Sequence, residues 1–308
     1  MIMKNTLILL CLSLTVLNNS RAFGQAPALP AQFGPHQWTA TVKVLGEDGN
    51  PIVGANVAFQ YAIPAVPNSG GQTYGEVKGV TDTNGMFSAS HTDSSWDLGV
   101  VAEKSGCYTT HIGHQFYFDE KNRHPTFTLM LKKIGKPIPM YAKSITYIKF
   151  PIFNKPIGYD LTIGDWVAPY GKGANTDFLF AENHVDAKSG YTFTVSFPNP
   201  GDGIQGLTRD WSLGVSGLVS FHEAPIDGYQ PKYEKTQMSN PDRIYYFRVR
   251  TKLDENGNVV SAHYGKIYGD FMQFRYYFNP TPNNRNIEFD PKQNLLGGLQ
   301  SFEGVSAP

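Results

Sequence analysis

The feature that most constrains this chain is a strict alternation of apolar and polar side chains between residues 38 and 61. In two consecutive segments the apolar positions are Trp38, Ala40, Val42 and Val44, then Ala55, Val57, Phe59 and Tyr61. Side chains of a β-strand point alternately to opposite faces, so this period of two predicts two strands, each with one buried and one solvated face. The residues between them, 47–51, include Asp48-Gly49-Asn50, which tolerate the positive φ angles of tight turns.

The same period continues through the second half of the chain. It predicts strands at 191–197 and 211–221, and a hairpin whose first strand carries Tyr245, Phe247 and Val249 and whose turn is residues 254–258. The return strand, up to residue 278, contains Gly265 and Gly269, which indicate a bend, a bulge or the close approach of another backbone. With 31 glycines, 21 prolines and no long stretch of helical periodicity, the chain is predicted to be all-β.

Three motifs in residues 37–132 resemble the carboxypeptidase regulatory-like domain. They are Pro51 to Val57 after a turn, Thr81 to Phe87, and Gly99 to Tyr108, the last with Cys107 inserted before the tyrosine. The resemblance implies an Ig-like β-sandwich of the prealbumin (transthyretin) type. Such modules are usually non-catalytic spacers or binding appendages, so the resemblance carries over no catalytic residues.

The chain is predicted to be exported and to contain two domains. Lys4, the apolar run 7–17 and Ala22-Phe23-Gly24 are typical of a secretory signal peptide, and the run is too short to span a bilayer. The expected organisation is a signal peptide at 1–24, a Pro/Ala-rich leader at 25–35, the regulatory-like sandwich at 36–133, and a second β-sandwich or jelly-roll-like domain at 140–308. The protein is therefore expected to be secreted or periplasmic, with no transmembrane segment after cleavage.

Charge and cysteine content exclude some classes of function. Loss of Lys4 and Arg21 with the signal peptide would leave 24 basic against 26 acidic residues, a net charge of −2, so a nucleic acid is not expected as a partner. Cys107 would be the one remaining cysteine, which forbids an intrachain disulfide. His111 and His114 lie three apart and would point to opposite faces of a strand, so no metal site is predicted, and no cofactor.

The candidate ligand-binding residues are Asp160, Asp165 and Asp177, with Trp166 and Tyr170 close by in the sequence. A glycosidase would use two such acids across a cleft flanked by aromatic rings. In the other interpretation, which we favour, the aspartates cap turns and Trp166 packs in the core, because sequence spacing alone sets no distance between the carboxylates.

The sequence thus leaves two classes of function. The favoured one is an exported, non-catalytic protein of the cell envelope with a binding or structural role, in which the first domain is a spacer. The alternative is a carbohydrate-active enzyme or carbohydrate-binding protein whose site lies in loops of the second domain. A carbohydrate and another envelope protein are the two partners considered, and whether the chain is an enzyme stays open.

Overall fold

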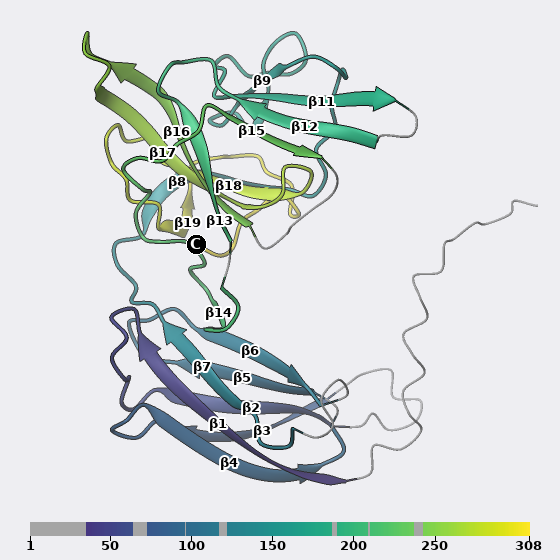
Figure 1. Cartoon of the computed structure of the whole chain (residues 1–308), viewed down its shortest axis with the longest axis vertical. Helices are drawn as coiled ribbons and strands as arrows, with labels where there is room; N and C mark the ends of the chain where they lie inside the picture. Colours follow the sequence, from purple (N-terminus) through teal and green to yellow (C-terminus); the bar gives the residue numbers. More distant parts are fainter. Residues whose placement is uncertain are drawn as a thin grey trace, which may run out of the picture.

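The protein is an all-β molecule built from two sandwich-like units, which lie one above the other in Figure 1. The computed structural model describes residues 35–63, 73–95, 97–116, 122–186, 190–208, 210–236 and 243–308, and these contain no helix. The predicted signal peptide, all of the predicted leader except Pro35, and Trp96 lie outside the described residues. In the described ranges, no helix has the length and apolar character needed to cross a membrane.

The first unit is a sandwich of a three-stranded and a five-stranded sheet. The small sheet has the order β4-β1-β7, with β1 and β7 parallel. The large sheet has the order β14-β6-β5-β2-β3. The strands are β1 (His36–Gly46), β2 (Asn56–Ile63), β3 (Thr73–Val80), β4 (Met86–Asp93), β5 (Asp97–Glu103), β6 (Thr110–Gln115), β7 (Thr126–Leu131) and β14 (Val215–Ser216).

The alternation seen in the sequence builds the core of this unit. Trp38, Val42, Val57 and Phe59 are each at most 2% exposed and pack between the two sheets. The intervening residues of β1 are half-buried or exposed. The predicted strands at 38–44 and 55–61 are therefore confirmed, with the predicted faces inward.

The second unit pairs a six-stranded sheet, β13-β16-β17-β18-β8-β19, with a five-stranded sheet, β10-β9-β11-β12-β15. Its strands are β8 (Ile138–Ile145), β9 (Ile157–Asp160), β10 (Asp165–Trp166), β11 (Phe178–Asp186), β12 (Gly190–Ser196), β13 (Gly203–Thr208), β15 (Lys232–Thr236), β16 (Arg243–Leu253), β17 (Val259–Gly269), β18 (Phe274–Phe278) and β19 (Phe289–Asn294).

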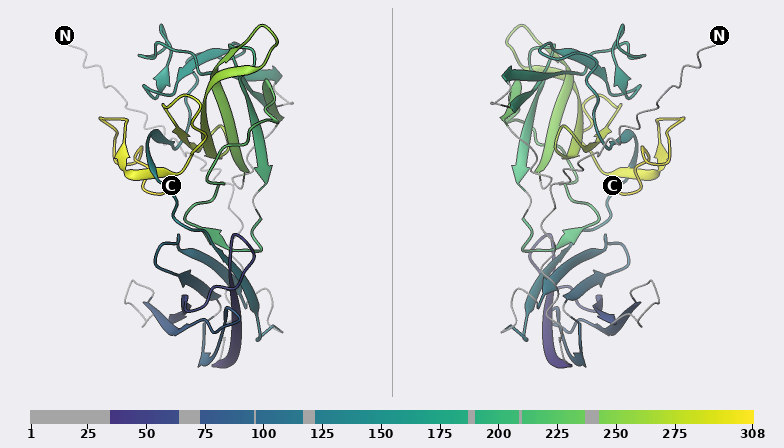
Figure 2. Two further views of the ribbon diagram at one scale, coloured as in Figure 1. Left: turned by 90° about the vertical axis from the view of Figure 1, so that its left-hand side faces the viewer. Right: turned by 90° about the vertical axis from the view of Figure 1, so that its right-hand side faces the viewer.

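The six-stranded sheet is covered on both faces. Tyr245 and Phe247 of β16 join the aromatic core between the two sheets. Ile244 and Tyr246, on the opposite face, join a second cluster with Ile287 and others from the C-terminal part of the chain. Figure 2 shows the C-terminus lying beside this unit, close to the waist between the two units. A sheet buried on both faces explains the near-continuous apolar run at 244–249.

The predicted hairpin is present, and the return segment is interrupted. Strands β16 and β17 pair around the turn at 254–258, and β18 follows as a separate strand after Gly269, whose φ is +102°. A Cβ on Gly265 would lie 2.2 Å from the Phe247 ring and 2.3 Å from the Tyr277 carbonyl oxygen. The two glycines thus mark a close approach and a bend, as the sequence predicted.

The segment 211–221 is where the strand prediction was wrong. Only Val215 and Ser216 form a strand, β14, and this strand pairs with β6 of the first unit. The chain leaves the second unit after β13, adds β14 to the edge of the other sandwich and returns, as Figure 1 shows. We call residues 211–220 the crossing segment. Trp211, at the start of this segment, is 45% exposed.

Candidate functional site

Two of the candidate aspartates of the second unit, Asp160 and Asp177, lie beside an arginine that the sequence analysis did not select. Arg250 occupies a β-bulge, because the β16–β17 register shifts between Val249 and Lys252. Its φ of +56° is uncommon for a residue with a side chain. An extra residue in a strand changes the face to which a side chain points. Arg250 therefore lies over the ring of Phe278, with its Cζ 5.0 Å from the centroid, on the side of the inter-sheet core.

Asp177 binds the Arg250 guanidinium in a bidentate ion pair. Arg250 Nε donates to Asp177 Oδ1 at 2.7 Å and Nη2 donates to Oδ2 at 3.0 Å, a geometry that fixes the arginine's orientation. The Leu161 amide also donates to Asp177 Oδ2, at 2.9 Å. Burial raises the pKa of Asp177, and the guanidinium opposes that rise. Both oxygens of the Asp177 carboxylate therefore accept hydrogen bonds from the chain itself.

Asp160 is buried behind this pair and is held by the backbone. Arg250 Nη2 lies 3.9 Å from its Oδ1. Oδ1 also accepts bonds from the Thr162 amide and hydroxyl, and Oδ2 accepts from the amides of Ala174 and Asn175 at 3.0 and 2.9 Å. Burial favours the neutral acid, but these donors outweigh it and hold the pKa of Asp160 below its ordinary value. An ionised carboxylate with four such donors organises the loop around it.

The other three candidates do not join this cluster. Asp165 pairs across the β9–β10 ladder with Asp160, but its carboxylate accepts from the amides of Trp166 and Lys172 at 2.8 and 2.9 Å. Trp166 is 9% exposed and packs in the inter-sheet core, where its Nε1 donates to the Lys149 carbonyl. Tyr170 is 41% exposed. The structure therefore brings Asp160 and Asp177 together and leaves the aromatic pair elsewhere.

A polar pocket of about 430 Å³ opens beside the ion pair. Its wall includes Asp177 and Arg250, together with Ala174, Asn175, Thr176, Asn199, Thr251 and Lys252. The Asn199 amide donates to Asp202 at 2.9 Å, and the same aspartate accepts from the Thr251 amide at 2.8 Å. The lining thus presents amide, hydroxyl and cationic groups on a frame that hydrogen bonds hold in place.

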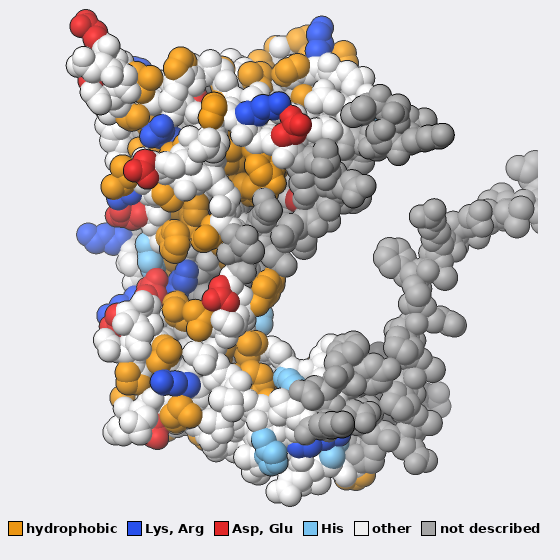
Figure 3. Space-filling view, in the orientation of Figure 1, with side chains coloured by type: hydrophobic (Ala, Val, Ile, Leu, Met, Phe, Trp, Pro, Cys, Tyr) orange, Lys and Arg blue, Asp and Glu red, His pale blue; other side chains and the backbone are white. Residues whose placement is uncertain are grey.

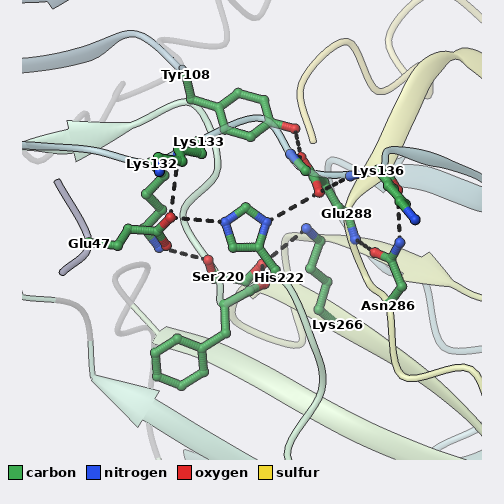
Figure 4. A network of polar contacts seen from close by, with 12 residues as sticks. Glu47, Tyr108, Lys132, Lys133, Lys136, Ser220, His222, Lys266, Asn286 and Glu288 are labelled. Atoms are coloured by element: carbon green, nitrogen blue, oxygen red, sulfur yellow. Dashed lines mark hydrogen bonds and ion pairs between the residues drawn. The ribbon is translucent and has the colours of Figure 1, made fainter. Parts of the chain in front are cut away.

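A second group of polar residues connects the two units where they meet, and we call it the junction (Figure 4). Its centre is Glu288, which is 1% exposed. Its Oε1 accepts from the Tyr108 hydroxyl at 2.5 Å and the Gly135 amide at 2.9 Å, and its Oε2 accepts from the Lys136 amide at 3.0 Å. Tyr108 belongs to the first unit, and residues 135 and 136 lie in the connection to β8. One carboxylate of the second unit therefore binds the first unit and the connection together.

His222 extends this junction to the first unit's Glu47. Its Nδ1 lies 3.2 Å from Glu288 Oε2, and its Nε2 lies 3.2 Å from Glu47 Oε2. Burial by itself raises the pKa of Glu288, but the bonds from Tyr108, Gly135 and His222 hold it below its ordinary value. Figure 4 shows His222 between the two carboxylates. Sequence reasoning missed this junction because its hydrogen-bonded partners are separated by as many as 180 residues.

A buried lysine lies beside the junction. Lys266 is fully buried, and its Nζ donates to the Ser220 hydroxyl at 3.1 Å and lies 4.7 Å from the centroid of the Tyr277 ring. Burial lowers the pKa of Lys266 well below its ordinary value. Lys132 of the first unit donates to the Ser220 carbonyl at 2.7 Å. Both lysines therefore fix the end of the crossing segment.

The described residues contain no group of three or more His, Cys, Asp or Glu side chains arranged to hold a metal ion. His111 of β6 is exposed and pairs with Val215 of the crossing segment, whereas His114 is half-buried against Phe116 and Phe127. The two histidines thus have separate surroundings.

Comparison with known proteins yields only distant structural matches. No family model and no curated protein matches the chain. The shaft pilin SpaA from Lactobacillus rhamnosus GG matches with a TM-score of 0.23 and 12% identity, over 55% of this chain and 90% of the pilin chain. A DUF3823 family protein from Parabacteroides merdae has a TM-score of 0.21 and 7% identity, over 82% and 98%. A streptococcal ancillary pilin has 0.20 and 11%, over 80% and 59%. Values this low carry no inference about function.

Proposed function

We propose that this chain is an exported, non-catalytic protein of the cell envelope, with a binding or structural role, in which the first unit is a carboxypeptidase regulatory-like spacer that presents the second. The observation that carries the proposal is the state of the candidate acids. Asp160 and Asp177 are at most 1% exposed, and the chain's own amides, a hydroxyl and a guanidinium occupy their oxygens. A glycosidase needs two carboxyl groups that reach the scissile bond.

The junction supports the spacer role. Glu288, Lys132 and the crossing segment connect the two units through side-chain bonds, backbone bonds and strand pairing. A spacer can present a binding unit in a fixed direction only when the link between them is held at several points. Export, with secretion or a periplasmic location, remains the expectation from residues 1–24.

Carbohydrate binding is the second candidate, favoured by the 430 Å³ pocket beside Arg250. Its amides, hydroxyl and guanidinium could hydrogen-bond a polyhydroxylated ligand in a concave site. Lys252 is an exposed member of the wall, as are Ala174, Asn175 and Asn199.

A glycan array and a hydrolysis screen on the purified mature protein test both candidates. The proposal expects no turnover; turnover that Asp165→Asn abolishes would overturn it, since Asp165 is the least buried of the three acids. For the second candidate, saturable binding should be weakened by Lys252→Ala and unchanged by Lys155→Ala, an exposed lysine outside the pocket wall. Binding that neither substitution weakens would show that the ligand binds outside this pocket.

A further inference from the structure

In the described part of the chain, the five-stranded sheet of the first unit ends in an open edge at β3. β3 is the last strand of this sheet, and among the described strands it pairs only with β2. The side chains on its outer face are Tyr74, Glu76, Lys78 and Val80. Tyr74 and Val80 are large apolar residues and are 59% and 58% exposed. The unpaired N–H and C=O groups of such an edge are a template for another strand.

Several other edge strands in the described part of the chain differ from β3. Along β4 the exposed side chains are Ser88, Ser90 and Thr92, which are small and polar. β15 follows Pro231, and β19 contains Pro291. The crossing segment lies beside the edge strand β7, and the Met130 amide of β7 donates to the Leu213 carbonyl of that segment. β3 is eight residues long and has no proline.

The sequence of β3 is complementary to itself. In an antiparallel pair of two β3 strands centred on Val77, the numbers of any two facing residues add up to 154. Tyr74 then faces the partner's Val80, and Glu76 faces the partner's Lys78. Opposite charges and apolar groups directly across from each other both stabilise an antiparallel pair. Each contact occurs twice, because a twofold axis relates the two strands.

We propose that β3 is a dimerisation edge, at which a second copy of this chain pairs antiparallel and makes one sheet continuous across both copies. The sheet order places β14, which joins the second unit, at the opposite edge from β3. In Figure 1 the second unit accordingly lies on the side of the first unit away from β3. The two second units of the dimer would point away from each other, with their surfaces accessible. The inference does not depend on the ligand of the second unit.

Charge reversal on the full protein tests the pairing by sedimentation velocity across micromolar to millimolar concentrations. The native protein should show a concentration-dependent dimer. Glu76→Lys places lysines opposite lysines and should weaken the dimer about tenfold or more. Lys78→Glu places glutamates opposite glutamates and should do the same. Circular dichroism should show both variants folded, because both side chains are on the exposed face of β3.

Restoration distinguishes this register from a general charge effect. The double variant Glu76→Lys/Lys78→Glu regains complementary pairs and should dimerise like the native protein. A mixture of the two single variants should form a one-to-one heterodimer. Glu234→Lys is the matched control, since Lys232 and Glu234 form an ion pair within β15 as Glu76 and Lys78 do within β3, and it should leave the dimer unchanged. A native protein that is monomeric throughout, a dimer insensitive to Glu76→Lys, or a mixture that stays monomeric would each overturn the proposal.

Discussion

Replacing Glu288 by glutamine removes one charge from the junction and keeps the size of the side chain. Four donors meet this carboxylate, from Tyr108, Gly135, Lys136 and His222. A glutamine can accept from the first two through its single oxygen, but its NH₂ group then faces the Lys136 amide, which is also a donor. The glutamine thus loses the charge-assisted bonds that Glu288 accepts from Lys136 and His222. Because Glu288 is 1% exposed, this loss should lower the free energy of unfolding by about 3–5 kcal/mol.

Urea unfolding followed by tryptophan fluorescence measures this change, since Trp38 and Trp166 are buried in the cores of the first and second units. Glu223→Gln is the control: Glu223 is an exposed partner of Arg285 near the same junction, and its loss should change stability by less than about 1 kcal/mol. A Glu288→Gln effect no larger than that of the control would refute the view that this carboxylate holds the units together.

The pH dependence has a definite sign. The pKa of Glu288 lies below its ordinary value of 4.5 in the folded protein, so its contribution is fully present above that value and is lost as the pH falls through the folded pKa. The stabilities of native protein and Glu288→Gln should therefore converge in acid. A constant difference down to the acid limit would show that the charge is not the source of the effect.

The remaining predictions address other sites. Arg250→Met should destabilise the protein by about 3–5 kcal/mol in urea unfolding, because it leaves Asp177 buried without its counter-charge; an effect below about 1 kcal/mol would contradict this. Cys107, which is free and half-buried, should react slowly with a thiol reagent in the native protein and fast in urea. Mass spectrometry of exported protein should find an N-terminus near residue 25, whereas an intact Met1 would refute signal cleavage.

The sequence predicted the parts of the fold that depend on local periodicity. Alternation at 38–61 identified the buried faces of β1 and β2, and the Asp254 to Asn258 turn identified the β16–β17 hairpin. It did not predict the direction of Arg250, because a one-residue bulge reverses the faces that a period of two assigns. It did not predict Glu288 as the centre of the junction either, since its partners come from three separate parts of the chain.

The crossing segment shows why periodicity alone cannot divide this chain into independent domains. Its apolar residues were assigned to a strand of the second unit, yet β14 pairs with β6 in the first. Gly214 makes this crossing fit: its φ is +77°, and a Cβ there would lie 2.4 Å from Leu129 and 3.0 Å from the His111 carbonyl oxygen, both in the first unit. The first sandwich is therefore completed by Val215 and Ser216, which lie about a hundred positions after their partners His111 and Thr110 in the sequence. Each unit depends on the other for part of its packing, and the link between them is part of the fold.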